Sequence, residues 1–262
     1  MPFLVIVACN PEAQPTAAAP VPTVAPAPSA SAEPIRNSTK LEADTLESPL
    51  SKASLYFAAP ELGAHITIAD PRSYRVHVIS DALGDDVVGL DVALDTGRAR
   101  RVSVTDPTVA LGELLSADSE LAPGAHWLFA APVLASGLVP RTAPGGPRTA
   151  RARRFFIGKA GSDAAESNGA VWLRKPEGTY NGAKSSEAVV FDAFTFSGHG
   201  TQIDTPCTIT LRSPAVSGQL QLGSPFVLHD VPSGTYEVVA RAASARPSTT
   251  RFTVNRELAG GS

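Results

Sequence analysis

The sequence predicts an all-β protein in which two antiparallel β-sandwich domains follow a disordered, Pro/Ala-rich N-terminal linker. Two observations predict the strands: short runs rich in β-branched and aromatic residues recur between residues 53 and 256, and several of them alternate apolar and polar positions. No comparably long stretch has helical spacing. At 262 residues, the chain is too long for one typical domain of about 100–150 residues and long enough for two small ones.

Charge and hydropathy narrow the classes of partner. The formal net charge is -3. Nucleic-acid-binding domains usually have a strongly basic surface, so we expect no nucleic-acid partner. No apolar run approaches the roughly 18 residues that a membrane-spanning helix needs, so we do not expect the chain to cross a membrane by itself.

Residues 1–9 are interpreted as the end of a short signal peptide. Residues 3–8 are apolar, and Ile6-Val7-Ala8-Cys9 resembles a bacterial lipobox. That resemblance implies lipid modification of the Cys9 thiol and removal of the preceding peptide. Only eight residues, none of them basic, precede Cys9, so we expect the natural chain to begin further upstream. The alternative is a short apolar N-terminus with an incidental cysteine.

Residues 10–52 form the predicted linker. Between Pro11 and Pro34 almost every residue is Pro, Ala, Ser, Thr or Val. Such a segment cannot bury a core, and its prolines favour extended polyproline II structure at about 3.1 Å per residue. Residues 36–52 are mixed and polar and continue the linker. A stiff spacer directly after an anchoring cysteine suits a domain that is tethered to a membrane.

The first domain is predicted at residues 53–160. Asp95-Thr96-Gly97 lies between two β-rich runs and indicates a hairpin turn, in which we expect Gly97 to supply a positive φ. The expected strands cover residues 54–57, 65–69, 73–79, 87–94, 98–104, 126–132 and 153–158.

The second domain is predicted at residues 168–256, followed by a flexible tail at 257–262. The run AVVFDAFTF (188–196) is largely apolar on both faces, which predicts a central strand. The expected strands cover residues 170–176, 188–196, 207–213, 218–223, 225–230, 235–242 and 249–255.

One pattern occurs near the end of each predicted domain. In LAPGAHWLFAA (121–131) and VPSGTYEVVARA (231–242), an aliphatic residue is followed by Gly, then by His126 or Tyr236, then by alternating apolar positions. Sandwiches of about 100 residues often carry a tyrosine here whose hydroxyl bonds back to the backbone across a corner. We expect Tyr236 to form such a corner and His126 to take its place in the first domain.

Together these features resemble a known group of proteins. The lipobox, the Pro/Ala spacer and a small sandwich with PEGTYNG (176–182) and VPSGTYEVV resemble envelope lipoproteins with immunoglobulin-like domains, found in GC-rich bacteria such as myxobacteria. The likeness covers the N-terminus and residues 169–256 best. It implies an immunoglobulin-like fold and a cell-envelope location, and it implies no activity and no catalytic residues.

The histidines do not form a recognisable site. None belongs to an HExxH motif or to another pair at i, i+3 or i, i+4. We expect structural roles for His77 and His126, whereas His199, in a Gly-flanked loop, and His229 are the candidates for a site assembled from distant residues. Because the spacing does not fit a known metal centre, we expect no metal, no cofactor and no catalytic residues.

Two further features each allow two interpretations. If Cys9 carries a lipid, Cys207 is a lone thiol and behaves as a small buried hydrophobe; a Cys9–Cys207 disulfide is the alternative. The arginines of the segment 141–154, with Arg98, Arg100 and Arg101, form either a cationic patch for anionic lipid, lipopolysaccharide or acidic glycan, or an ordinary solvated surface. We favour the solvated surface.

The sequence therefore predicts a protein of the cell envelope, at the outer membrane or its periplasmic face, anchored by a lipid on Cys9. We expect a non-catalytic binding or scaffolding module with an envelope protein or a glycan as partner, contacted through loops 141–152 and 177–187. One alternative is a metal-handling or enzymatic protein with a site around His199 and His229. Another is a passive structural subunit of an envelope assembly.

Overall fold

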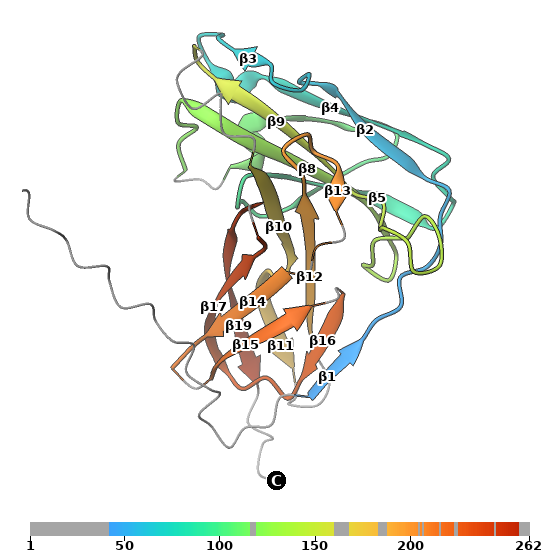
Figure 1. The fold of residues 1–262 in the computed structure, drawn as a ribbon, viewed down its shortest axis with the longest axis vertical. Coiled ribbons are helices and arrows are strands. Elements are labelled where there is room, and N and C mark those ends of the chain that lie inside the picture. The colour runs from blue at the N-terminus through green and yellow to red at the C-terminus, as the bar shows by residue number, and fades with distance from the viewer. Residues whose placement is uncertain are drawn as a thin grey trace, which may run out of the picture. The chain divides into compact units, whose positions relative to one another are not determined.

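The structure, a computed structural model, describes residues 42–256 except 116–118, 160–167, 183–187, 204, 206, 215, 223–224 and 244. Strands dominate these residues, with short 3-10 turns at η1 (Pro71–Ser73) and η2 (Leu111–Leu114). The strands pair into sheets that form two β-sandwiches (Figure 1). The prediction of an all-β protein with two antiparallel sandwiches is confirmed.

The first sandwich contains one sheet in the order β2-β4-β7 and a second in the order β3-β9-β8-β5-β6. The core between these sheets includes Leu55, Val78, Leu90, Leu128 and Phe155. Its strands are β2 (Ser54–Ala59), β3 (His65–Ile66), β4 (Arg75–Asp81), β5 (Val87–Leu94), β6 (Arg100–Val102), β7 (Thr108–Ala110), β8 (Gly124–Leu134) and β9 (Arg151–Ile157).

The second sandwich contains one sheet in the order β1-β16-β12-β10-β18, in which β13 also pairs with β12, and a second in the order β11-β19-β17-β14-β15. Its core includes Phe191, Ile209, Tyr236, Val238 and Phe252. Its strands are β1 (Glu42–Thr45), β10 (Gly169–Lys175), β11 (Gly178–Gly182), β12 (Val189–Phe196), β13 (Gln202–Ile203), β14 (Cys207–Arg212), β15 (Ser217–Leu222), β16 (Phe226–His229), β17 (Gly234–Arg241), β18 (Ala245–Arg246) and β19 (Ser248–Arg256).

The two sandwiches share one topology. The sheet β3-β9-β8-β5-β6 corresponds strand by strand to β11-β19-β17-β14-β15, and each begins with a strand that runs parallel to its neighbour. The sheet β2-β4-β7 likewise corresponds to β10-β12-β16. Two packed antiparallel sheets connected in this order, with a tyrosine corner, characterise immunoglobulin-like sandwiches. Both domains are immunoglobulin-like.

The predicted corner is present in both sandwiches. The Tyr236 hydroxyl donates a hydrogen bond to the Pro232 carbonyl over 2.9 Å, and His126 Nε2 lies 2.7 Å from the Ala122 carbonyl oxygen. In both cases the acceptor lies four residues upstream of the ring. Tyr236 pairs with Phe252 on the neighbouring strand, as His126 pairs with Phe155. The first sandwich therefore uses an imidazole where the second uses a phenol.

Removal of the corner hydroxyl gives a prediction. Tyr236→Phe leaves the ring in the core but deprives the Pro232 carbonyl of its donor, so we expect a loss of about 0.5–1.5 kcal/mol in the free energy of unfolding. Denaturant-induced unfolding measures this change. Tyr56→Phe, which alters a phenol on an exposed side chain, is the control and should stay near the wild type; equal losses in both variants would contradict a role for the corner.

Four strands are buried on both faces. β5 and β8 carry alternate residues of the first core, and β10 and β12 carry alternate residues of the second. Apolar residues on their other faces contribute to a third cluster between the sandwiches. Strands covered on both faces read as near-continuous apolar runs. This explains why AVVFDAFTF is largely apolar on both faces, and β12 is a central strand, as predicted.

The cluster between the sandwiches is rich in aromatic rings. The Phe129 ring stacks on Trp172 at a centroid distance of 5.5 Å, and Trp172 stacks on Phe194 at the same distance. Trp127 and Phe196 also contact Phe129. Phe129 and Trp127 come from β8, whereas Trp172, Phe194 and Phe196 come from β10 and β12. The two sandwiches thus share a hydrophobic core and belong to one compact unit.

A chain of ion pairs continues this contact, and we call it the interdomain ion chain. It consists of Arg101, Asp91, Arg174, Asp192 and Arg148, with alternating charges. The Arg174 guanidinium donates to Asp91 Oδ2 and Asp192 Oδ2, each over 2.9 Å, and to the Gly137 carbonyl. Arg101 pairs with the other Asp91 oxygen, and Arg148 pairs with Asp192 Oδ1.

Burial makes the interdomain ion chain a strong structural constraint. Arg174 and Asp192 side chains are 1% and 2% exposed. Burial alone would raise the pKa of Asp192, but Arg148 and Arg174 outweigh it and hold that pKa below its usual range. Burial also favours protonated Asp91, yet Arg101 and Arg174 lower its pKa as well. Both carboxyl groups are therefore held as carboxylates.

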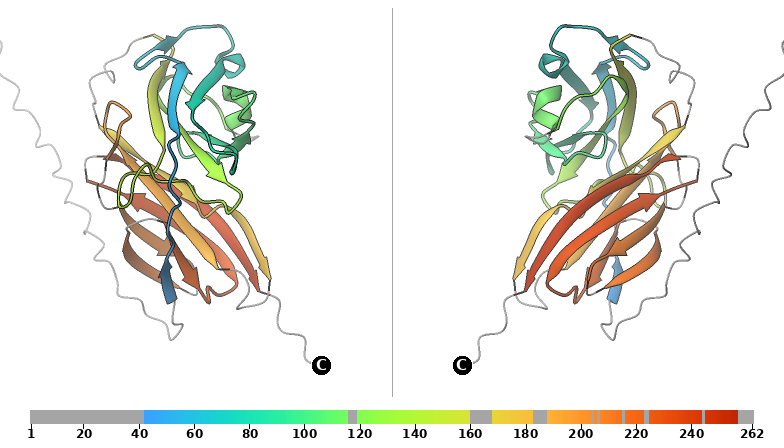
Figure 2. Two further views of the ribbon diagram at one scale, coloured as in Figure 1. Left: turned by 90° about the vertical axis from the view of Figure 1, so that its right-hand side faces the viewer. Right: turned by 90° about the vertical axis from the view of Figure 1, so that its left-hand side faces the viewer.

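The segment before the first sandwich is ordered, which corrects the linker prediction for residues 42–52. β1 pairs with β16 of the second sandwich. The chain then passes residues 49–51, which exchange backbone hydrogen bonds with Arg141, and enters β2 of the first sandwich (Figures 1 and 2). This segment joins both sandwiches. The rest of the predicted linker and the tail at 257–262 lie outside the described residues.

Candidate functional site

An open cleft of about 820 Å³ lies between the sandwiches. One wall comes from the turn after β5 and from the segment around η2, and the other comes from β17, β18 and β19. A cleft of this size is in the range of small-ligand sites. The lining residues are Leu94, Asp95, Thr96, Gly97, Arg98, Leu114, Leu115, Ser119, Glu120, Glu237, Arg246, Thr249, Thr250 and Arg251.

The turn between β5 and β6 shapes the first wall. Its left-handed residue is Asp95, with φ 52°, and not Gly97 as predicted from the sequence. Asp tolerates this conformation better than most residues because its short polar side chain bonds locally. Gly97 is needed for space instead, since a Cβ there would lie 2.8 Å from the Leu94 carbonyl oxygen.

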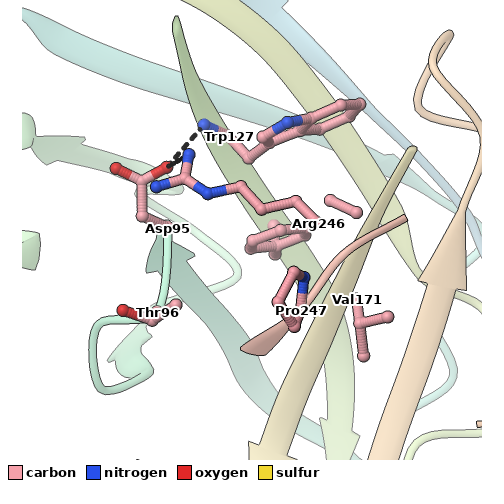
Figure 3. Close-up of a pocket in the computed structure, with 8 residues that line it drawn as sticks. Asp95, Thr96, Trp127, Val171, Arg246 and Pro247 are labelled. Carbon is pink, nitrogen blue, oxygen red and sulfur yellow. Dashed lines mark hydrogen bonds and ion pairs between the residues drawn. The ribbon is translucent and has the colours of Figure 1, made fainter. Parts of the chain in front are cut away.

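Asp95 makes hydrogen bonds to three residues at the bottom of the cleft. Its Oδ1 accepts hydrogen bonds from the Trp127 backbone N–H over 3.0 Å and from Arg246 over 3.3 Å, and its Oδ2 lies 2.7 Å from His126 Nδ1. Figure 3 shows the Arg246 side chain reaching Asp95 alongside Trp127. Because Arg246 belongs to the second sandwich, Asp95 connects the two walls.

The pocket next to Asp95, below the cleft, is too small for a ligand. A pocket lined by Trp127, Phe129, Val171 and Pro247, with Asp95 and others, has a volume of only about 10 Å³ (Figure 3). That volume is at the lower limit for one water molecule. The pocket is therefore a packing gap in the shared interface, and the open cleft above it is the candidate site.

His126 is held by two acceptors. One ring nitrogen faces Asp95 and the other faces the Ala122 carbonyl. Burial alone would lower the pKa of His126, but the hydrogen bond and charge of Asp95, together with the Ala122 carbonyl, raise it above its usual value. The charge on the imidazole thus complements the Asp95 carboxylate.

Three further charged residues of the cleft, Arg98, Glu237 and Arg251, form ion pairs. Glu237 and Arg251 face each other across β17 and β19 and form an ion pair at 3.3 Å. Arg98, on the first sandwich, reaches Glu177 on the second at 3.4 Å. With these ion pairs and the threonine hydroxyls of β19, the cleft presents positive charges, negative charges and neutral hydrogen-bonding groups. Such a surface suits hydrogen-bonded binding of a polar ligand.

The two histidines proposed for a metal site do not meet. His229 ends β16, next to Val189 at the start of β12, whereas His199 follows the other end of β12. The length of β12 separates them by roughly 23 Å, given about 3.3 Å per strand residue. No group of three metal-ligating side chains occurs among the described residues. The alternative of one site around His199 and His229 is wrong.

The loop that carries His199 takes part in the contact between the two sandwiches. The Gly200 carbonyl accepts a hydrogen bond from the Ala152 N–H of β9 over 3.2 Å. Gly200 has φ 79°, and a Cβ there would lie 2.1 Å from the Ala152 carbonyl oxygen. The glycine beside His199 therefore permits a close backbone approach between the sandwiches.

The arginine-rich segment is not a free cationic patch. Arg148 is buried in the interdomain ion chain and lies over the Phe194 ring at 3.8 Å. Arg153 donates to the Phe57 carbonyl, Arg154 is buried, and Arg100 pairs with Glu113. Arg148 and Ala152 therefore join this segment to the second sandwich, whereas residues 142–145 and 147 are exposed, and a contact role for loop 141–152 stays a prediction. The solvated-surface interpretation was incomplete, because Arg148, Thr149, Ala150, Ala152 and Arg154 are buried.

Cys207 is a free, buried thiol at the start of β14, as expected if it is not paired with Cys9. Burial raises the pKa of its thiol to about 11. Cys9, the expected point of lipid attachment, lies outside the described residues, as does the part of loop 177–187 beyond β11.

This environment predicts an unreactive thiol. In Cys9→Ala protein, where Cys207 is the remaining cysteine, we expect a maleimide to label the native protein at least about tenfold more slowly than the denatured protein, because labelling requires an exposed thiolate. A time course with and without denaturant measures this ratio. Equal rates in both conditions would contradict the buried position.

The described residues contain no helix that is long and apolar enough to cross a bilayer.

Comparison with known proteins yields similarities at low identity. No protein-family model matches the sequence, and no curated protein matches it. The fibronectin(III)-like modules of Clostridium thermocellum CbhA are 11% identical, over 79% of this chain and 97% of theirs, with a TM-score of 0.26. The N-terminal Ig1-2 module of the Drosophila receptor protein tyrosine phosphatase DLAR is 11% identical, over 77% and 99%, with a TM-score of 0.24.

A larger protein is similar over a shorter share of its length. The alpha-2-macroglobulin of E. coli is 11% identical to this chain. The match covers 80% of this chain and 16% of that protein, with a TM-score of 0.29. The assignment of both domains as immunoglobulin-like therefore rests on their strand order and corner residues.

The cleft was not predicted from the sequence. The turn at residues 95–97 and the corner position of His126 were predicted, but no sequence signal connected them with Arg246, which lies 151 residues beyond Asp95. The sequence signal for the interface was the set of strands that are apolar on both faces, because a strand buried on both faces needs a second covering layer. That signal predicts an interface, although it does not identify the partner strand.

Proposed function

We propose that this chain is a lipid-anchored protein of the cell envelope that acts as a non-catalytic binding or scaffolding module. Two immunoglobulin-like sandwiches form its folded body, and a lipid on Cys9 holds it at the outer membrane or its periplasmic face. Its partner is an envelope protein or a glycan. The interdomain cleft is the contact site.

The shared interface carries this proposal. The aromatic cluster and the interdomain ion chain connect β5 and β8 of one sandwich to β10 and β12 of the other. A buried contact of this kind opposes relative motion of the domains, which would otherwise be the default. The two walls of the cleft are consequently held at a fixed spacing, and a preorganised site binds its ligand at a lower entropic cost.

The shifted pKa values support a non-catalytic role. Perturbed groups often mark active sites, but structural ion-pair networks perturb pKa values too. Here Asp91, Asp192, Arg148 and Arg174 belong to the interdomain ion chain. Tyr236, whose pKa burial raises, bonds to the Pro232 carbonyl. The ion-pair partners account for the shifts of Asp91, Asp192 and Arg174, and burial accounts for those of Arg148 and Tyr236.

The binding role is tested by site-specific photo-cross-linking in cells. A photoreactive amino acid replaces Thr249, which is exposed in the cleft, or Thr45, a matched exposed threonine of β1 outside it. We expect a discrete cross-linked species from position 249 and none from position 45. Cross-links from neither position would favour the passive structural subunit, and equal cross-links from both would remove the cleft as the contact site.

The anchor is tested separately. Cells expressing the natural full-length chain are labelled with a fatty-acid analogue, and wild type is compared with Cys9→Ala. We expect labelling of the wild type and a loss of at least about tenfold in the variant, because a lipobox cysteine is the attachment point. Unchanged labelling would refute the lipid anchor without affecting the cross-linking result.

A further inference from the structure

We propose that the outer face of β14, β17 and β19, together with the interdomain cleft that it borders, binds a linear acidic glycan, a polysaccharide whose sugars carry carboxylate groups. We call this surface the arginine–threonine face. Its outward-facing side chains include Arg212, Arg241 and Arg251. The inference rests on the proposed binding function and deepens it, because it chooses the glycan over the envelope protein and assigns a charge to it.

Strand alternation places these residues on the outside of the second sandwich. Successive side chains of a strand point to opposite faces of the sheet, and Ile209, Val238 and Phe252 of the same three strands lie in the core. The residues that alternate with the core residues are exposed or half-buried. The arginine–threonine face is therefore open to a ligand.

The charge of this face is opposite to that of the whole chain. Its three arginines are accompanied by one acidic residue, Glu237, whereas the formal net charge of the chain is -3. Acidic residues gather elsewhere, since residues 42–90 contain eight of them and only three lysines and arginines. An anionic polymer is therefore attracted to the arginine–threonine face and repelled by the segment 42–90.

The guanidinium groups of the face are available to a ligand. Arg212 and Arg241 are exposed, and neither forms an ion pair with a described residue. Arg251 pairs with Glu237 at 3.3 Å, but its side chain is 76% exposed, and exposed ion pairs are weak. A guanidinium has five N–H donors in a planar fork that matches a carboxylate. The face thus binds carboxylates without the loss of any buried contact.

The arginines are spread over the face rather than gathered at one point. The strand register places Arg212, Glu237 and Arg251 in one row, which spans roughly 10 Å at the usual spacing of neighbouring strands. Arg241 lies further along β17, roughly 13 Å from that row. Charges at this spacing suit a polymer with repeated carboxylates, because simultaneous contacts raise the overall affinity.

Hydroxyl groups lie among the arginines and match the hydroxyls of a sugar chain, since a threonine hydroxyl both donates and accepts hydrogen bonds. The outward-facing threonines are Thr208, Thr210, Thr235, Thr249 and Thr253. Thr249 and Arg251 also line the interdomain cleft, together with Arg246, whose side chain is 51% exposed. A glycan that lies across β17 and β19 therefore reaches the cleft.

The face lacks the apolar anchors of a protein-binding surface. Among the outward-facing residues of β14, β17 and β19, all of which the structure describes, the one apolar residue is Val239, and it is half-buried. Protein interfaces have an apolar or aromatic centre from which charged residues are depleted, and binding to a membrane surface also needs an apolar face. These residues include no aromatic ring on which a neutral sugar could stack. An acidic glycan is the partner that fits.

Binding of the full chain to immobilised polysaccharides tests the proposal. Polygalacturonate and hyaluronate carry carboxylates, and dextran is the neutral reference. Biolayer interferometry measures each affinity at about 0.15 M salt and again at higher salt. We expect the chain to bind both carboxylated polymers, with an affinity that falls as salt increases, and to bind dextran at least about tenfold more weakly.

Two matched double variants locate the site. Arg212→Gln with Arg241→Gln removes two charges from the face, and Arg72→Gln with Arg75→Gln removes two charges from exposed positions in η1 and β4. We expect the first pair to weaken binding about fivefold or more, because two charged contacts are lost, and the second to stay within about twofold of wild type. Circular dichroism verifies that both variants fold, and the preference of the wild type for carboxylated polymers is measured independently of them.

The outcomes separate this inference from the proposed binding function. Equal affinity for dextran, or equal losses in the two double variants, would overturn the acidic ligand or its position on this face. Absence of binding to all three polymers would also overturn the inference. In that case a cross-linked protein from position 249 would leave the binding module in place, whereas no cross-link from that position would remove both.

Discussion

Asp192→Asn is expected to destabilise the protein by about 3–5 kcal/mol, because removal of one member of a buried ion network leaves uncompensated buried charge. Asp192 lies between Arg148 and Arg174, and all three side chains are at most 5% exposed. Asparagine keeps the shape of the side chain but removes the charge that both guanidinium groups require. Chemical denaturation of wild type and variant measures the difference.

The acid limb of the stability profile provides a second measurement on this variant. The pKa of Asp192 is lowered in the folded state. Its contribution is present above the unfolded pKa of about 3.9 and is lost as pH falls through the folded value. Asp192→Asn should therefore flatten the decline of stability below about pH 4. Asp81→Asn, on an exposed side chain of β4, is the matched control and should change stability by less than about 0.5 kcal/mol; a similar effect of both would refute the role of the interdomain ion chain.

Trp172→Ala is the second substitution with a large expected effect. The indole is 1% exposed and stacks between Phe129 of the first sandwich and Phe194 of the second. Truncation of a buried tryptophan to alanine typically costs about 3–5 kcal/mol, from lost burial and from the cavity that remains. We expect a loss of this size in the free energy of unfolding.

Trp172→Phe is the matched control for that substitution. The buried Trp172 Nε1 has no hydrogen-bond partner among the described residues. Replacing the indole with a phenyl ring therefore reduces the packing area but removes no hydrogen bond. We expect it to retain most of the stability that alanine loses. Comparable losses in both variants would show that ring stacking across the interface is not what stabilises the protein.

The strands were largely predictable from the sequence, because their alternation is a local property. The run at 87–94 coincides with β5, and the run at 188–196 differs from β12 by one residue. Short strands such as β7 and β18 were missed. Two or three residues contain too little periodicity to distinguish a strand from a loop, and these strands depend on neighbours distant in the chain.

The candidate site was less predictable for a related reason. Asp91 and Arg174 are 83 residues apart, and Asp95 and Arg246 are 151 apart. A single sequence shows that a buried strand contains a charged residue, but it does not show which distant residue neutralises the charge. The predicted linker failed at β1 for the same reason, since this exposed strand is held by pairing with β16.

Cooperative unfolding tests most directly the claim that the two sandwiches are joined into one body. Both tryptophans of the chain, Trp127 and Trp172, lie in the shared cluster. Their fluorescence therefore reports on the interface, while far-ultraviolet circular dichroism reports on the strands of both sandwiches. We predict coincident transitions for the two signals in a denaturant titration. A fluorescence transition at lower denaturant concentration, with the strand signal intact, would contradict this account.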